Sequence, residues 1–170
     1  ASAEGFLRIA VGAGGRLAAL AGDESFVCLP KPSADFQPRA ATALFVGALA
    51  AVLEDAGLWR GARAELSLAA QVLRARMDGY ADRAAPLAVA LRDRVPLIFA
   101  PVGLGQCLAR IIKIKFNENA KVPAFWNEVP ELNHNEMVGF TRRLAPFTAV
   151  MLEAPRMSAP MRRRWRATQA

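Results

Sequence analysis

The sequence predicts an α/β protein, a three-layer α/β/α sandwich around a parallel sheet, from three observations. Short apolar runs alternate with longer segments of helical periodicity, and glycine or proline residues separate many of them. The 170-residue chain has 54% hydrophobic and 22% charged residues, so it can bury a core. Strands that alternate with helices favour parallel pairing, with helices covering both faces of the sheet.

The first stretch of the chain predicts a strand, a helix and a strand, then a proline-rich connection and three helices. In chain order these are the strand Phe6–Val11, the helix Arg16–Ala21, the strand Phe26–Leu29 and the helices Ala40–Leu58, Ala62–Met77 and Pro86–Asp93. The last two helices are amphipathic and are expected to bridge two α/β stretches.

The alternation resumes in the second stretch, where strands and helices again follow one another. In chain order these are the strand Val95–Ala100, the helix Leu104–Phe116, the strand Val122–Trp126, the helix Glu136–Arg143, the strand Phe147–Leu152 and the helix Ala159–Thr168. Because the chain begins at a strand and stops inside the last helix, we expect a fragment of a longer protein.

The net charge of +7 has its excess mainly in the tail, at Arg156, Arg162, Arg163, Arg164 and Arg166. A solvated helix face is the simplest interpretation of this cluster. A positive field would also raise the encounter rate of anionic small substrates. A nucleic-acid partner is not expected, because only the tail favours one.

Neither a membrane partner nor a secretory signal is expected. The apolar run Ala41–Leu53 is too short to span a bilayer, and we interpret it as a buried helix. No cationic region followed by an apolar stretch opens the chain, so a cytoplasmic location is expected. Cys28 and Cys107 lie among apolar residues without a paired spacing, which predicts buried free thiols rather than a disulfide or metal site.

The glycine-rich segment 12–15, Gly-Ala-Gly-Gly, lies between a predicted strand and a predicted helix. Backbone amides at such a place can hold an anion, although the spacing matches neither the dinucleotide fingerprint nor a P-loop. A tight turn is the preferred interpretation.

Two polar segments, Asn117–Lys121 and Glu131–Glu136, contain Glu118 and the chain's one histidine, His134. Asparagine amides compete for backbone hydrogen bonds, so both segments are expected to form loops that hold polar ligands. Taken singly, the glutamate fits a solvated helix end and the histidine an ordinary surface group. No second His or Cys stands at ligand spacing, so metal binding is not expected.

Taken together, the two segments resemble a known family. The sequence NENAKVPAFWN begins at Asn117 and PELNHNE begins at Pro130, and residues 117–139 are closely similar to the bifunctional phosphoglucose/phosphomannose isomerases. These are proteins of two sugar-isomerase (SIS) domains. The sequences QPRAA at 37–41 and GGRL at 14–17 add support.

The resemblance implies an SIS-type fold that is incomplete at both ends. Residues 1–58 would be the C-terminal part of a first SIS domain with a linking helix, and residues 59–170 the N-terminal and central part of a second. It also implies interconversion of glucose 6-phosphate and fructose 6-phosphate, a step of glycolysis and gluconeogenesis, without metal or organic cofactor. Mannose 6-phosphate stays open as a further substrate, because discrimination at C2 depends on pocket shape.

The same resemblance assigns roles to three residues, and the chemistry suits them. Glu118 would move a proton between C1 and C2 through an enediol, which needs a tuned carboxylate. Arg39 would stabilise the enediolate, since a cation offsets the developing negative charge. His134 would assist ring opening, because an imidazole exchanges protons near neutral pH.

Glu118 precedes the predicted strand Val122–Trp126 and His134 follows it, which separates them by roughly 17 Å. The connection between strand and histidine could fold back, or a homodimer could place one subunit's glutamate beside its partner's histidine. The resemblance implies such a shared site.

The chain departs from the family in its loops. The Ser/Thr-rich phosphate loop and a late catalytic lysine are absent and would lie outside this chain, so this piece alone is expected to be inactive. The segment Ala100–Gly103 is less polar than the Ser/Gly loop usual in these domains. The alternative function is a non-catalytic SIS-type regulatory module that binds sugar phosphate, against which the presence of both Glu118 and His134 argues.

Overall fold

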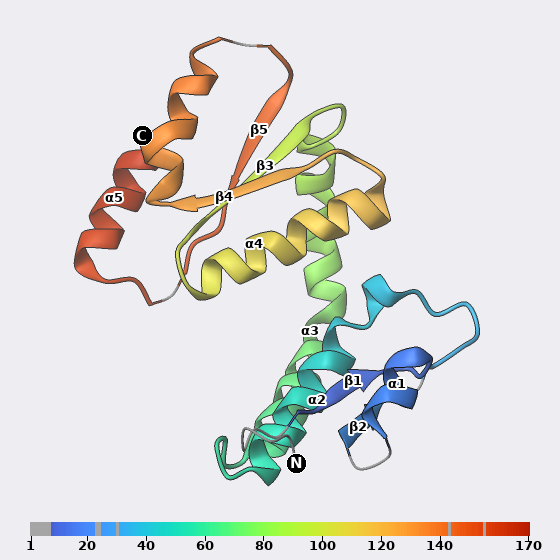
Figure 1. The fold of residues 1–170 in the computed structure, drawn as a ribbon. Coiled ribbons are helices and arrows are strands. Elements are labelled where there is room, and N and C mark those ends of the chain that lie inside the picture. The colour runs from blue at the N-terminus through green and yellow to red at the C-terminus, as the bar shows by residue number, and fades with distance from the viewer. Residues whose placement is uncertain (1–7, 23–24, 30, 143, 155) are drawn as a thin grey trace. The chain divides into compact units, whose positions relative to one another are not determined.

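A computed structural model describes residues 8–22, 25–29, 31–142, 144–154 and 156–170 (Figure 1). The chain divides into two compact units, Ala1–Gly79 and Tyr80–Ala170. The division falls inside helix α3, Ala62–Ala90. The boundary that we placed between residues 58 and 59 concerns the limits of SIS domains, and it stays a prediction.

The first unit contains a strand, a helix and a parallel strand, as predicted. Strand β1, Ala10–Gly12, pairs with β2, Phe26–Cys28, and helix α1, Arg16–Ala21, connects them. Phe6 and Leu7 of the predicted first strand lie outside the described residues. The glycines between β1 and α1 have positive φ angles of 123° at Gly14 and 74° at Gly15, which favours the tight-turn interpretation.

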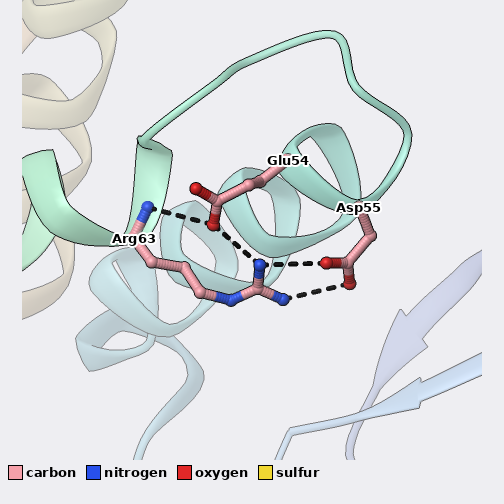
Figure 2. Close-up of polar contacts among 3 residues, drawn as sticks. All are labelled: Glu54, Asp55 and Arg63. Carbon is pink, nitrogen blue, oxygen red and sulfur yellow. Dashed lines mark hydrogen bonds and ion pairs between the residues drawn. The ribbon is translucent and has the colours of Figure 1, made fainter.

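A short 3-10 helix, η2 (Pro38–Ala40), precedes helix α2, Thr42–Asp55. The connection from α2 to α3 is closed by three charged side chains (Figure 2). Arg63 Nη1 lies 2.7 Å from Glu54 Oε2 and 2.9 Å from Asp55 Oδ1. The hydrogen bond from Arg63 holds the pKa of Asp55 below its ordinary value, and the bonds to Asp55 and Glu54 raise the pKa of Arg63.

Helix α3 corrects one prediction, because it runs unbroken for 29 residues where we expected two helices. Pro86 lies inside it. A proline removes one backbone hydrogen bond and leaves the carbonyl four residues earlier without its usual donor. The helix is exposed from Arg83 to Ala90, so water can reach that carbonyl.

The second unit is built on a three-stranded parallel sheet in the order β4-β3-β5. Its strands are β3 (Val95–Pro101), β4 (Phe125–Val129) and β5 (Phe147–Met151). The predicted strand Val122–Trp126 starts three residues later than we expected. Residue 123 is a proline, which cannot donate to the strand ladder, and Lys121 has a left-handed φ of 59°.

Helices cover both faces of this sheet, which confirms the three-layer prediction (Figure 1). Helix α4, Leu104–Lys115, covers one face through Ala109, which packs with Ile98 and Ala100 of β3. Helix α5, Ala159–Gln169, covers the other through Trp165, which is 1% exposed. Burial of apolar area on both faces is the main stabilising term of the unit.

Helix α4 lies very close to the carboxyl end of β3. A Cβ atom at Gly105 would come within 3.1 Å of Pro101 Cδ and 3.3 Å of Ala100 Cβ. Gly105 is buried, so a side chain at this position would require its neighbours to shift by a few tenths of an ångström.

Both cysteines correct the prediction of buried thiols. Cys28 and Cys107 are free, as expected, but exposed. Cys107 lies on α4 between the buried residues Gly105 and Ala109, so its side chain points away from the sheet. Among the described residues, no helix is long and apolar enough to cross a membrane.

Candidate active site

Glu118 lies in a π-helical turn, η3 (Phe116–Ala120), that extends α4 by five residues. The turn ends at Lys121, whose backbone N–H donates to the Phe116 carbonyl. Two side chains close it: Asn117 Nδ2 donates to the Val122 carbonyl at 3.0 Å, and Lys121 Nζ donates to the Glu118 carbonyl at 2.6 Å. The Glu118 side chain is exposed.

This geometry corrects the expectation that Asn117–Lys121 forms a loop. The helix continues through Glu118, and Lys121 rather than an asparagine takes the left-handed position at its end. Asn117 does not disrupt the helix, because its amide donates across the turn to Val122 instead of competing for a helical carbonyl.

His134 lies in a second π-helical turn, η4 (Leu132–Glu136), which follows β4. A 3-10 helix, η5 (Met137–Thr141), continues from it where a short helix was predicted from Glu136. The remaining predicted residue Arg143 lies outside the described residues. The polar segment 131–136 is thus helical rather than a loop, and it exposes the His134 side chain.

Side chains on both sides of His134 are held in place. Leu132 is 2% exposed and belongs to the core that includes Trp165. Asn133 Nδ2 donates to Thr168 Oγ1 of α5 at 2.9 Å. Asn127 Nδ2 of β4 donates to Glu136 Oε2, also at 2.9 Å. The turn is therefore fastened to the core, to α5 and to the sheet.

The structure keeps Glu118 and His134 apart within one subunit. The segment that leaves α4 and the segment that leaves β4 lie at opposite ends of strand β4 (Figure 1). The five residues of β4 correspond to roughly 17 Å. One chain therefore does not bring the two side chains together, in agreement with the spacing argument.

Arg39 belongs to the first unit, in η2. It is half-buried, and its Nη1 donates to Gln37 Oε1 at 3.3 Å. A hollow of about 220 Å³ in this unit is lined by Ala13 and Pro38, among others. The hollow thus borders both the glycine turn and the segment of Arg39.

A second hollow, of about 510 Å³, lies where β3 and β5 end in the second unit. It is lined by Pro101, Val102, Gly105, Arg156 and Ser158, among others. The segment Ala100–Gly103 therefore presents the apolar side chains of Pro101 and Val102 to this hollow, as expected from its low polarity. No three His, Cys, Asp or Glu side chains of the described chain gather as a metal site.

Several polar contacts of the site have no signal in the sequence pattern. Thr168 lies 35 residues from its partner Asn133, and no local pattern links them.

Glu128 Oε2, on β4, is buried and has no hydrogen-bond partner among the described residues. Its neighbour Trp126 has the Arg110 guanidinium 5.6 Å above its ring, a cation–π contact that tethers α4 to β4.

Comparison with known proteins identifies the domain. Residues 81–170 match the family model described as the bacterial phospho-glucose isomerase C-terminal SIS domain, so the chain belongs to this SIS family. A bifunctional phosphoglucose/phosphomannose isomerase from Caldicellulosiruptor bescii is 31% identical over 146 residues, covering 82% of this chain. The alignment covers 43% of that relative, so the chain spans less than half its length. No solved structure matches the chain significantly.

Proposed function

We propose that this chain is part of an aldose–ketose isomerase that interconverts glucose 6-phosphate, or mannose 6-phosphate, and fructose 6-phosphate through an enediol. One observation supports this most: an SIS-family domain exposes Glu118 and His134 at the centres of two turns at the ends of β4. An exposed carboxylate and an exposed imidazole are the groups that proton transfer to and from a sugar requires.

In this proposal Glu118 removes the proton from the carbon next to the carbonyl and returns it to the neighbouring carbon. Arg39 stabilises the enediolate oxygens with its fixed positive charge. His134 exchanges protons with the ring oxygen and hydroxyl during ring opening. The proposed enzyme is a homodimer, in which the Glu118 of one subunit works beside the partner's histidine.

The test uses the complete isomerase to which this chain would belong. Glu118→Gln keeps the shape of the side chain and removes the base, so turnover of fructose 6-phosphate should fall at least about 10²-fold with binding retained. Glu65→Gln makes the same chemical change at an exposed residue of α3, and it should leave turnover unchanged.

Exchange of the C2 proton with deuterated solvent gives a second readout of the same step. It should disappear with Glu118→Gln and persist with Glu65→Gln. A wild-type protein that binds sugar phosphate but shows neither turnover nor exchange would overturn the proposal and favour a regulatory binding module.

A further inference from the structure

The residues around His134 are held far more firmly than the imidazole itself. Leu132 is buried in the core, Asn133 contacts α5, and Glu136 accepts a hydrogen bond from β4. Between them, the His134 side chain is exposed. The surrounding structure thus fixes the backbone of the turn and leaves the ring free to meet a ligand.

The contact with α5 is a directed chain of hydrogen bonds. Asn133 Nδ2 donates to Thr168 Oγ1 at 2.9 Å, and that hydroxyl donates to the Arg164 carbonyl, also at 2.9 Å. A hydroxyl has one proton, so donating it to Arg164 leaves its lone pairs for Asn133. Hydrogen bonds in such a chain polarise and strengthen one another.

Helix α5, which accepts the hydrogen bond from Asn133, is itself anchored in the core. Trp165, one turn before Thr168, is 1% exposed and packs in the cluster that contains Leu132. Adjacent Cα atoms are about 3.8 Å apart, so a shift of Asn133 moves His134 with it. A change at Thr168 is therefore transmitted to the imidazole through one neighbouring residue.

We propose that Thr168 is a positioning residue that acts through Asn133 to hold His134 in the orientation needed for proton transfer. The inference rests on the proposed function, because it concerns the role of His134 in sugar isomerisation. Without the hydroxyl, the half-buried Asn133 amide keeps only the Met137 sulfur at 3.0 Å, which is a weak acceptor. The turn then loses its hydrogen bond to α5 and keeps only the packing of Leu132 against Trp165.

The matched variants are Thr168→Val, which keeps the side-chain shape without the hydroxyl, and Thr168→Ser, which keeps the hydroxyl. In the complete isomerase, Thr168→Val should lower kcat about 10-fold with little change in KM, since small misplacements of a catalytic group are costly. Thr168→Ser should restore kcat.

A double-mutant cycle separates positioning from general destabilisation. If Thr168 acts through His134, the valine change should have almost no effect on kcat in a His134→Ala background. An equal fall in both backgrounds, or unchanged kcat in Thr168→Val, would overturn the inference.

A second readout does not depend on isomerase activity. The imidazole signal of His134 in histidine-labelled protein, assigned by its loss in His134→Gln, should shift or broaden in Thr168→Val and return in Thr168→Ser. If the wild type lacks turnover, the proposed function fails while this signal still decides the coupling. If the wild type is active and the signal does not respond, the coupling fails and the proposed function stands.

Discussion

Two five-residue π-helical turns, Phe116–Ala120 and Leu132–Glu136, stand at opposite ends of β4, and each exposes its central residue. The first continues α4, is closed by hydrogen bonds between residues no more than six apart, and packs Phe116 against the core between α4 and the sheet. The second follows a strand and depends on contacts with the core, with β4 and with Thr168, 35 residues away.

The difference lies in what each turn needs from the rest of the fold. The turn of Glu118 is formed by the same short segment that builds the end of α4. The contacts that hold the turn of His134 come from β4, α5 and the core. Sites held by packed elements and supporting hydrogen bonds are more closely defined than sites held locally. We therefore expect perturbations of α5 to affect His134 and to spare Glu118.

The largest effect is expected in a test of whether Glu118 and His134 of one active site come from different subunits. Mixing Glu118→Gln protein with His134→Ala protein should restore activity, because a hybrid dimer contains one site with neither mutation. Random exchange at equal amounts should give about one quarter of wild-type turnover, since half the dimers are hybrids with one intact site.

Each mutant mixed only with itself is the control and should stay inactive. Subunit exchange is followed with two affinity tags. Exchange without recovered turnover would mean that both residues act within one subunit, and it would remove the geometric basis of the comparison.

An intermediate effect is expected from the core beneath the His134 turn. Trp165→Ala should lower the free energy of unfolding by about 3–5 kcal/mol, the usual range for a buried tryptophan. Trp165→Phe should cost less, because it also removes an indole N–H that is buried without a partner among the described residues.

Amide hydrogen exchange in Trp165→Phe shows which segments become less stable. Amides of residues 132–136 should exchange faster than in the wild type, and amides of residues 116–120 should not. Equal acceleration of both turns would contradict the proposed difference in support.

The smallest effect concerns the charged connection between α2 and α3 in the first unit. Arg63→Met removes its contacts with Glu54 and Asp55, which are exposed or half-buried, so a small fall in the unfolding midpoint at pH 7 is expected. Arg63 lies outside the three segments that carry Arg39, Glu118 and His134, so turnover should not change.

The difference in unfolding midpoint between wild type and Arg63→Met should depend on pH, because Asp55 has a lowered pKa. Its stabilising contribution is present above about pH 4 and is lost as the pH falls through the lower folded-state pKa. The midpoints of wild type and Arg63→Met should therefore converge as the pH falls below about 4. A constant difference over that fall in pH would show that the charges do not stabilise this connection.

The parts of the fold that depend on local pattern were predictable from the sequence. Strands β3 and β5 and helices α4 and α5 have the expected places within a residue or two, because their hydrophobic periodicity is strong. Helix α3 was not predictable as one element, since Pro86 is a breaker unless solvent compensates for the lost bond. The apolar neighbours of Cys107 suggested burial, yet neighbours in a helix face different directions.

The candidate site was predictable only in its exposed residues. Glu118 and His134 stand in distinctive sequence, and the strand between them predicted their separation. The side chains that hold the turns were not predictable, because Asn133 and Thr168 meet only when α5 packs on the sheet. A residue pair 35 positions apart leaves no trace in periodicity or spacing.

Because α4 contacts β3 closely at Gly105, a small change of the helix direction there would move the far end of the helix, where Glu118 lies. From Gly105 to Glu118 the helix extends about 20 Å, at 1.5 Å per residue. A methyl group at Gly105 would lie 3.1 Å from Pro101 Cδ, so α4 or Pro101 would have to shift by a few tenths of an ångström. A tilt of about 3° would displace the far end by about 1 Å, which is enough to misalign a proton transfer. The position of Glu118 is therefore linked to the packing at the other end of α4, where Gly105 has no side chain.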